Sequence, residues 1–275
     1  GVAAIAGVTV YGFMDYGLTG AFVVPLIFAV MNVVVGYKSF WSYVTQNHPA
    51  RRVEEFRIAL GIAKVFSMIS VFWALFDQHA STWVLQAEQM VRTVKFEFFG
   101  KVLLETEIIP SQFSAVNPIF VMAMIPIYTY VIYPFFDKFY PMTSLRRMGW
   151  GFMVAAVGFA TAALIQYPID AGTPVHIMWQ SVQYLLMTAA EVMISITGLT
   201  FAYTQAPKSM KSTIMSFWLL TVFIGNLLTA TIVKISIFPV NTGNFYMFFA
   251  GLIFVAGIVF ALLIRNYQVR DASEA

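Results

Sequence analysis

The chain has 275 residues, of which 60% are hydrophobic, 17% aromatic and only 11% charged. Soluble domains carry about a quarter charged residues, so this composition argues against a soluble enzyme, a disordered tail and a nucleic-acid-binding module. The net charge is only +3, the basic residues are scattered and cysteine is absent, which argues against a nucleic-acid partner and excludes disulfides and thiolate metal sites.

Apolar runs of membrane-spanning length dominate the sequence. A helix needs about 20 apolar residues to cross a bilayer, and seven runs approach or exceed that length. An eighth run, residues 2–14, is too short to span a membrane alone, and it lacks the basic start of a secretory signal. We therefore interpret Gly1 as a point within a longer protein. The seven runs cover residues 21–43, 57–85, 113–136, 148–165, 176–203, 212–237 and 245–264.

Basic residues in the connecting segments predict the orientation, because Lys and Arg accumulate in cytoplasmic loops. Loops 167–175 and 239–244 contain none, and segment 84–112 mixes three basic residues with four glutamates. The alternation predicts a multi-pass protein of the cell membrane, or of the inner membrane in a bacterium, with a cytoplasmic C-terminus. The basic segments are 46–57, 137–148, 206–212 and the C-terminal tail.

Two carboxylates fall inside apolar helices, where a charge is costly and marks a functional candidate. Asp77 lies late in its helix, and Glu191 lies in the middle of a long span. Helical spacing places Trp73 on the face of Asp77 and Ser195 on the face of Glu191, because residues four apart are neighbours on a helix. Each face therefore has an acid beside an aromatic or polar group, as a water-filled substrate cavity requires.

Structural interpretations compete with these functional ones. An Arg on a neighbouring helix can neutralise Asp77 for assembly alone, whereas the spans contain no obvious basic partner for Glu191 at similar depth. Asn117, with Pro118 and Pro126 in the same run, fits either a cavity lined by irregular backbone or a plain kink.

Enzyme and cofactor motifs are missing from the sequence. It contains no H-E-x-x-H, G-x-S-x-G, Walker or G-x-G-x-x-G pattern. We therefore expect no enzyme activity, no catalytic residue, no metal and no cofactor other than protons as a coupling ion.

An ordered set of motifs resembles the proton-coupled oligopeptide transporters (POT/PTR family) of the major facilitator superfamily. Residues 73–78 are similar to the family's seventh-helix signature, and Asn117-Pro118 with Pro126 to the eighth helix. Residues 134–149 resemble the loop into the ninth helix, residues 191–212 the tenth helix and its exit, and residues 216–227 the eleventh.

The resemblance implies the fold: an all-α membrane protein, with a six-helix carboxy-terminal bundle of the superfamily plus one or two preceding helices. Residues 1–46 would be the sixth helix or part of an inserted hairpin, residues 47–56 a cytoplasmic linker and residues 57–275 the bundle. The family's first-helix E-x-x-E-R motif is absent, since the Glu54, Glu55 and Arg57 string has other spacing and is expected in a loop. An amino-terminal half is therefore expected upstream.

The resemblance also implies roles for matched residues. Glu191 would receive the amino terminus of a di- or tripeptide, with Ser195 nearby, and Asn117 would contact its backbone or termini. Trp73 and Trp218 would line the pocket.

Proton coupling would use Asp77, in a salt bridge with the amino-terminal half, together with Glu191. Thr200 and His79 depart from the residues common in the family, which puts gating and proton details in question. The expected function is proton-coupled peptide symport across the lipid bilayer. A transporter of a different small solute, or a truncated non-transporting membrane interaction module, are the alternatives.

Overall fold

The computed structural model describes residues 41–98, 101–235, 238–265 and 267. The chain divides into two compact units, Gly1–Arg57 and Ile58–Ala275. The first predicted run, 21–43, lies outside the described residues except for its last three, and so does nearly all of the region 1–46.

Residues 50–56, which were expected to form a linker, are helical. Helix α2 (Ala50–Phe76) begins directly after Pro49, whose carbonyl oxygen accepts a hydrogen bond from Arg52 N at 2.9 Å. Within the first unit Arg51 pairs with Glu55 at 3.3 Å, an i,i+4 arrangement that stabilises a helical turn. The expectation of a loop here was wrong, because it rested on charge and ignored this helix-favouring spacing.

Six helical segments of the described chain are long and apolar enough to cross a membrane, which confirms the six predicted runs from residue 57 onward. The first joins α2, the 3-10 turn η1 (Asp77–Ala80) and α3 (Thr82–Glu88). The second joins α4 (Pro110–Phe113), α5 (Val116–Ile127), the π-helical turn η2 (Tyr128–Ile132) and α6 (Tyr133–Asp137). The third is α7 (Ser144–Asp170).

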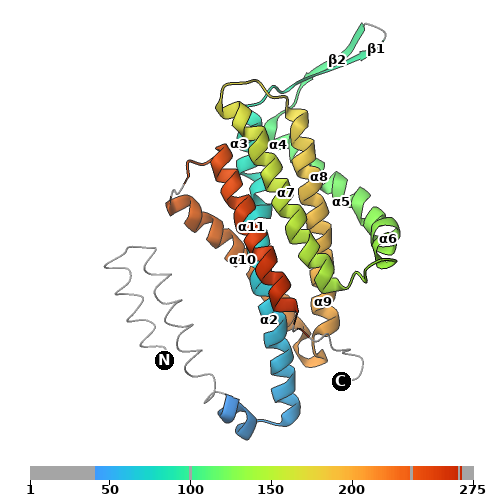
Figure 1. Ribbon diagram of the computed structural model, residues 1–275, viewed down its shortest axis with the longest axis vertical. Coiled ribbons are helices and arrows are strands. Elements are labelled where there is room, and N and C mark those ends of the chain that lie inside the picture. The colour runs from blue at the N-terminus through green and yellow to red at the C-terminus, as the bar shows by residue number, and fades with distance from the viewer. Residues whose placement is uncertain (1–40, 99–100, 236–237, 266, 268–275) are drawn as a thin grey trace. The chain divides into compact units, whose positions relative to one another are not determined.

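The remaining three segments complete the bundle of the second unit (Figure 1). The fourth joins the 3-10 turn η3 (Ile177–Trp179), α8 (Gln180–Glu191), the π-helical turn η4 (Val192–Ile196) and α9 (Thr197–Gln205). The fifth joins the 3-10 turn η5 (Lys208–Met210) to α10 (Lys211–Ile235), and the sixth is α11 (Gly243–Ile264).

Helix α7 lies against α11 along an aromatic seam. Phe152 packs on Phe260 with ring centroids 5.1 Å apart, and Phe159 packs on Phe249 at 6.1 Å. A methyl group at Gly257 would lie 2.9 Å from Phe152 Cβ, so only glycine permits this approach. Small residues at such crossings let membrane helices come close enough for dispersion contacts to hold them together.

Buried glutamines connect α3 to both α8 and α7. The side-chain oxygen of Gln86 accepts hydrogen bonds from the amides of Gln180 at 3.1 Å and Gln183 at 2.9 Å. Its own amide donates to Ala162 O at 3.1 Å. All three glutamines are fully buried, so these bonds hold three helices in register.

A two-stranded hairpin interrupts the helical fold. Strands β1 (Thr93–Phe98) and β2 (Lys101–Glu107) pair antiparallel within a segment that was expected to be a loop. Lys95 of β1 pairs with Glu105 of β2 at 2.9 Å, and Arg92, the residue before β1, pairs with Glu107 at 2.6 Å. The mixed charges of this segment are thus explained by cross-strand pairing, and the all-α description holds for the bundle but not for this loop.

The hairpin is anchored to the bundle through Val91, which bonds to the backbone just before η3 and to the first residue of η3. Val91 N donates to Val175 O at 2.8 Å, and Ile177 N donates to Val91 O at 2.9 Å. At the same end of the bundle Asp170 Oδ2 accepts a hydrogen bond from Gly243 N at 2.8 Å, which fixes the end of α7 to the start of α11 (Figure 1).

Candidate functional site

The carboxylate of Glu191 is hydrogen-bonded to the side-chain amide of Asn117. Asn117 Nδ2 donates to Glu191 Oε2 at 3.1 Å, and Thr188 Oγ1 donates to Asn117 Oδ1 at 2.5 Å. Asn117 is 7% exposed and Thr188 is fully buried, whereas Glu191 is half-buried. Because Thr188 occupies the amide oxygen, the amide NH2 group is oriented toward the carboxylate, and the acid is held by a fixed donor.

The helix geometry around Glu191 is irregular. Glu191 ends α8, and the following turn, η4, is π-helical. Such turns are rare and occur frequently at functional sites. Ser195 lies in this turn with its hydroxyl buried and without a hydrogen-bond partner, so no bond connects it to Glu191 within the described chain.

The two predicted pocket tryptophans touch one another. Trp73 and Trp218 meet edge to face, with ring centroids 6.1 Å apart at 84°. Phe66 packs on Trp218 at 5.3 Å, and a methyl group at Gly198 would lie 2.8 Å from the Trp218 ring. The indole nitrogen of Trp73 is buried and has no hydrogen-bond partner among the described residues.

Asp77 lies where α2 gives way to the 3-10 turn η1. Its side chain is half-buried, and no ion pair to it exists in the part of the chain that the structure describes. The break is stabilised by its neighbours: Gln78 Nε2 donates to Ala74 O at 3.0 Å, and Tyr184 donates to His79 O at 2.7 Å. The alternative of an Arg partner on a neighbouring helix of this chain therefore has no support in the described residues.

The structure thus brings the predicted residues together as two separate pairs, Asn117 with Glu191 and Trp73 with Trp218. No hydrogen bond or ring contact between described residues joins one pair to the other or to Asp77. Thr188 was missed from the sequence, although its position three residues before Glu191 on the same helix face is a usable signal. Within the described ranges no group of histidines and carboxylates forms a metal site.

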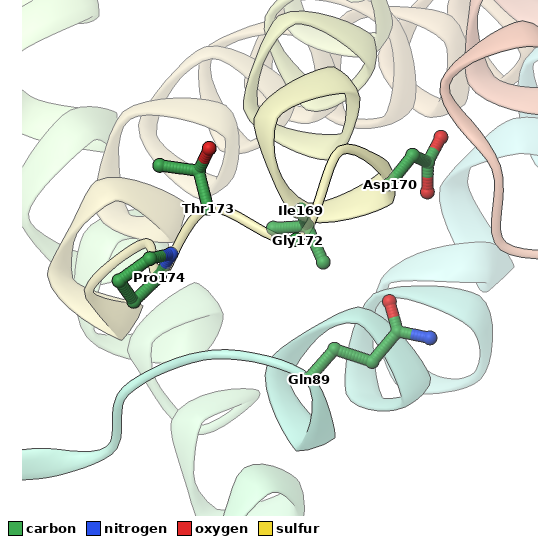
Figure 2. A pocket seen from close by; sticks show the side chains of 6 residues that line it. All are labelled: Gln89, Ile169, Asp170, Gly172, Thr173 and Pro174. Atoms are coloured by element: carbon green, nitrogen blue, oxygen red, sulfur yellow. The ribbon is translucent and has the colours of Figure 1, made fainter.

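One cavity lies away from all of these residues. It has a volume of about 410 Å³ and lies at the hairpin end of the bundle, where α3, the end of α7 and the following loop meet (Figure 2). Gln89, Asp170 and Thr173 line it. Asp170 already accepts hydrogen bonds from Gln166 and Gly243, so this cavity has a structural explanation and no free acid.

Comparison with known proteins decides the family. A family model described as the POT family matches residues 24–249. The chain belongs to the POT family. Within that family, the peptide transporter PTR2 of Saccharomyces cerevisiae is 31% identical over 233 residues, which are 78% of this chain and 36% of the relative. Solute carrier family 15 member 1 of Homo sapiens is 30% identical over 177 residues, 64% of this chain and 24% of the relative.

Solved POT-family structures share the fold. The POT family transporter PepTSo superposes with a TM-score of 0.77 at 34% identity, covering 98% of this chain and 53% of that chain. An auto-inhibited POT family peptide transporter superposes with a TM-score of 0.76 at 33% identity, and the match covers 98% of this chain and 54% of that chain. The resemblance and the transporter fold of the superfamily are therefore confirmed. This POT-family chain spans 36% to 41% of the first four curated relatives and about half of these structures.

Proposed function

We propose that this chain forms the carboxy-terminal half of a proton-coupled symporter that carries di- and tripeptides by alternating access. Relatives named peptide transporters support this substrate class, and transporters of the superfamily bind solute between two halves. The amino-terminal half is then a required partner, and the protein acts as a transporter and not as an enzyme.

The observation that carries the proposal is the carboxylate of Glu191, which lies within a span and has no cationic partner among the described residues. It accepts one hydrogen bond, from Asn117, which leaves acceptor capacity for another donor. Unpaired acids inside a membrane are costly and mark substrate or ion pathways. A peptide ammonium would supply the missing positive charge and donors.

The remaining predicted residues have roles that fit a peptide. Asn117 and Ser195 supply hydrogen-bonding groups, and Ser195 has a buried hydroxyl without a partner. Trp73 and Trp218 supply apolar surface for side chains. Asp77 would exchange its proton as its environment changes between conformations, because a cationic partner stabilises the ionised form and burial stabilises the neutral form.

We also propose that the C-terminus is cytoplasmic, in a cell membrane. The basic segment 137–148, the turn at residues 206–212 and the end of α11 share one end of the bundle (Figure 1). Positive residues favour the cytoplasmic side. The hairpin would then face the opposite side of the membrane.

The test is uptake of labelled dialanine into proteoliposomes that contain the full-length protein, with and without a pH gradient. Glu191→Gln keeps the shape of the side chain and removes its charge, so the affinity for peptides with a free amino terminus should fall about ten- to a hundred-fold. N-acetylated peptides, which lack that charge, should bind the variant and the wild type alike. Glu88→Gln, at an exposed carboxylate, is the matched control.

Two outcomes would count against the proposal. Equal losses for free and acetylated peptides would make Glu191 a structural residue. Transport of an anion without an amine, in place of dialanine, would favour a different solute on the same fold, and no transport at all would favour the interaction module.

A further inference from the structure

A second cavity, of about 260 Å³, lies between two spans at the end opposite the hairpin. One wall comes from α5, η2 and α6, the other from η4 and α9, and the first turn of α7 closes the end. None of the predicted transport residues lines it. We call it the Arg147 groove, after the one basic side chain in its wall.

The guanidinium of Arg147 has N–H donors that make no hydrogen bond within the described residues. Its Nε donates to Met142 O at 2.7 Å, and its guanidinium lies 4.0 Å above the ring of Tyr133. No ion pair to Arg147 is formed by any residue the structure describes. Asp137 also lines the groove, but it accepts a hydrogen bond from Met142 N at 2.5 Å and makes no salt bridge with Arg147.

The hydroxyl of Tyr133, a second wall residue, lacks a partner. Tyr133 is 7% exposed, and its hydroxyl oxygen is buried without a hydrogen bond. Thr197, also in the wall, lies close to it without meeting hydrogen-bond geometry. A buried hydroxyl without a partner costs free energy, which a ligand that accepts its proton would offset.

The start of α7 adds to this excess of donors. Ser144, the first residue of α7, lines the groove, and the side chain of the N-cap residue Thr143 makes no capping bond. The first N–H groups of a helix and its dipole attract anions. An unpaired guanidinium, an unpaired phenol and an uncapped helix start therefore meet in one place, which favours an anion over a cation.

The deeper walls of the groove are apolar. Ile125 lies twelve residues before Asp137 on the same segment, about 18 Å along a helix at 1.5 Å per residue. Val192 and Ile196 line the opposite wall. The groove is thus charged at the end of the spans and apolar toward their middle, as an amphiphile requires.

We propose that the Arg147 groove binds an anionic phospholipid. The phosphate would accept hydrogen bonds from Arg147 and Tyr133 at the helix ends, and an acyl chain would lie along Ile125 and Ile196. Basic pockets between membrane helices are typical of sites for anionic lipid headgroups. Glu191 does not line this groove, so the lipid proposal can be tested independently of peptide transport.

Native mass spectrometry of the full-length protein in detergent, titrated with phosphatidylglycerol, tests the proposal. Arg147→Gln should weaken lipid binding about ten- to a hundred-fold, because it removes charge-assisted hydrogen bonds. Tyr133→Phe should weaken it about three- to tenfold while leaving thermal stability without lipid unchanged or higher, since its hydroxyl has no partner in the protein. Arg146→Gln and Tyr128→Phe, neighbours outside the groove, are matched controls and should retain binding.

Three results would overturn the proposal. Equal weakening by Arg146→Gln and Arg147→Gln would indicate attraction to the general surface charge. Equal binding of phosphatidylcholine would remove the preference for an anionic lipid. Displacement of phosphatidylglycerol by millimolar inorganic phosphate would make the groove an ion site that does not use the apolar walls.

Discussion

Replacing Gly225 by alanine tests how closely α10 and α2 are packed. A Cβ atom at this position would lie 2.6 Å from Ser70 O, 2.7 Å from Trp73 Cβ and 2.9 Å from Ala74 N. These atoms belong to the backbone or are bonded to it, so no rotamer change can move them away. To reach ordinary contact, the helices would have to separate by roughly 0.8 Å.

The cost follows from this separation. Overpacking of a close contact costs about 1–3 kcal/mol, and the hydrogen bond from Thr229 Oγ1 to Ala74 O, 2.6 Å long, would stretch as well. Alanine recovers part of this through its helix preference, up to about 1 kcal/mol. We expect Gly225→Ala to lower the free energy of unfolding by about 1–2 kcal/mol.

The measurement is equilibrium unfolding of the full-length protein in mixed micelles with increasing dodecyl sulfate. Gly251→Ala on α11 is the control, because beyond the adjoining residues and backbone of α11 itself no atom lies within 4 Å of the position that the new methyl group would take, and its stability should be unchanged or slightly higher. If Gly225→Ala is as stable as Gly251→Ala, α10 does not depend on close approach to α2, and the reasoning fails.

Three other changes have defined outcomes. Asp77→Asn should reduce proton-driven peptide uptake more than peptide exchange without a gradient, and equal loss in both assays would make Asp77 structural. Cysteine at Thr143 should react poorly with an impermeant reagent added outside intact cells, whereas efficient labelling would reverse the proposed orientation. Gln86→Leu should lower the free energy of unfolding by about 1–3 kcal/mol, because the buried amide of Gln183 loses its acceptor, and an unchanged stability in micelle unfolding would contradict that role.

The spans could be predicted from the sequence because hydropathy reports directly on the surrounding lipid. The hairpin was not predicted, although Val94, Phe96 and Phe98 alternate with Lys95 and Glu97 as in a strand. The charges of this segment were interpreted only as a signal of membrane orientation. The alternation of apolar and charged residues, which predicts a strand, was not recognised.

The site was predicted residue by residue but not as an arrangement. Asn117 and Glu191 were chosen separately, as an asparagine beside a proline and a buried acid, and sequence spacing within one helix cannot show that they meet across two helices. Thr188 was missed because a threonine in an apolar helix most often bonds to its own backbone. The roles of these residues in transport remain predictions.

The seam between α7 and α11 bears on how the protein is made. Translation delivers α11 after α7, separated by the time needed to synthesise about 70 residues, and elongation runs at about 5–20 residues per second. Until then Phe152 and Phe159 face lipid, and the carboxylate of Asp170 lacks the N–H group of Gly243. The seam between α7 and α11 can therefore close only after α11 has been inserted, and a chain stopped before Gly243 would leave this flank of α7 exposed to quality-control factors.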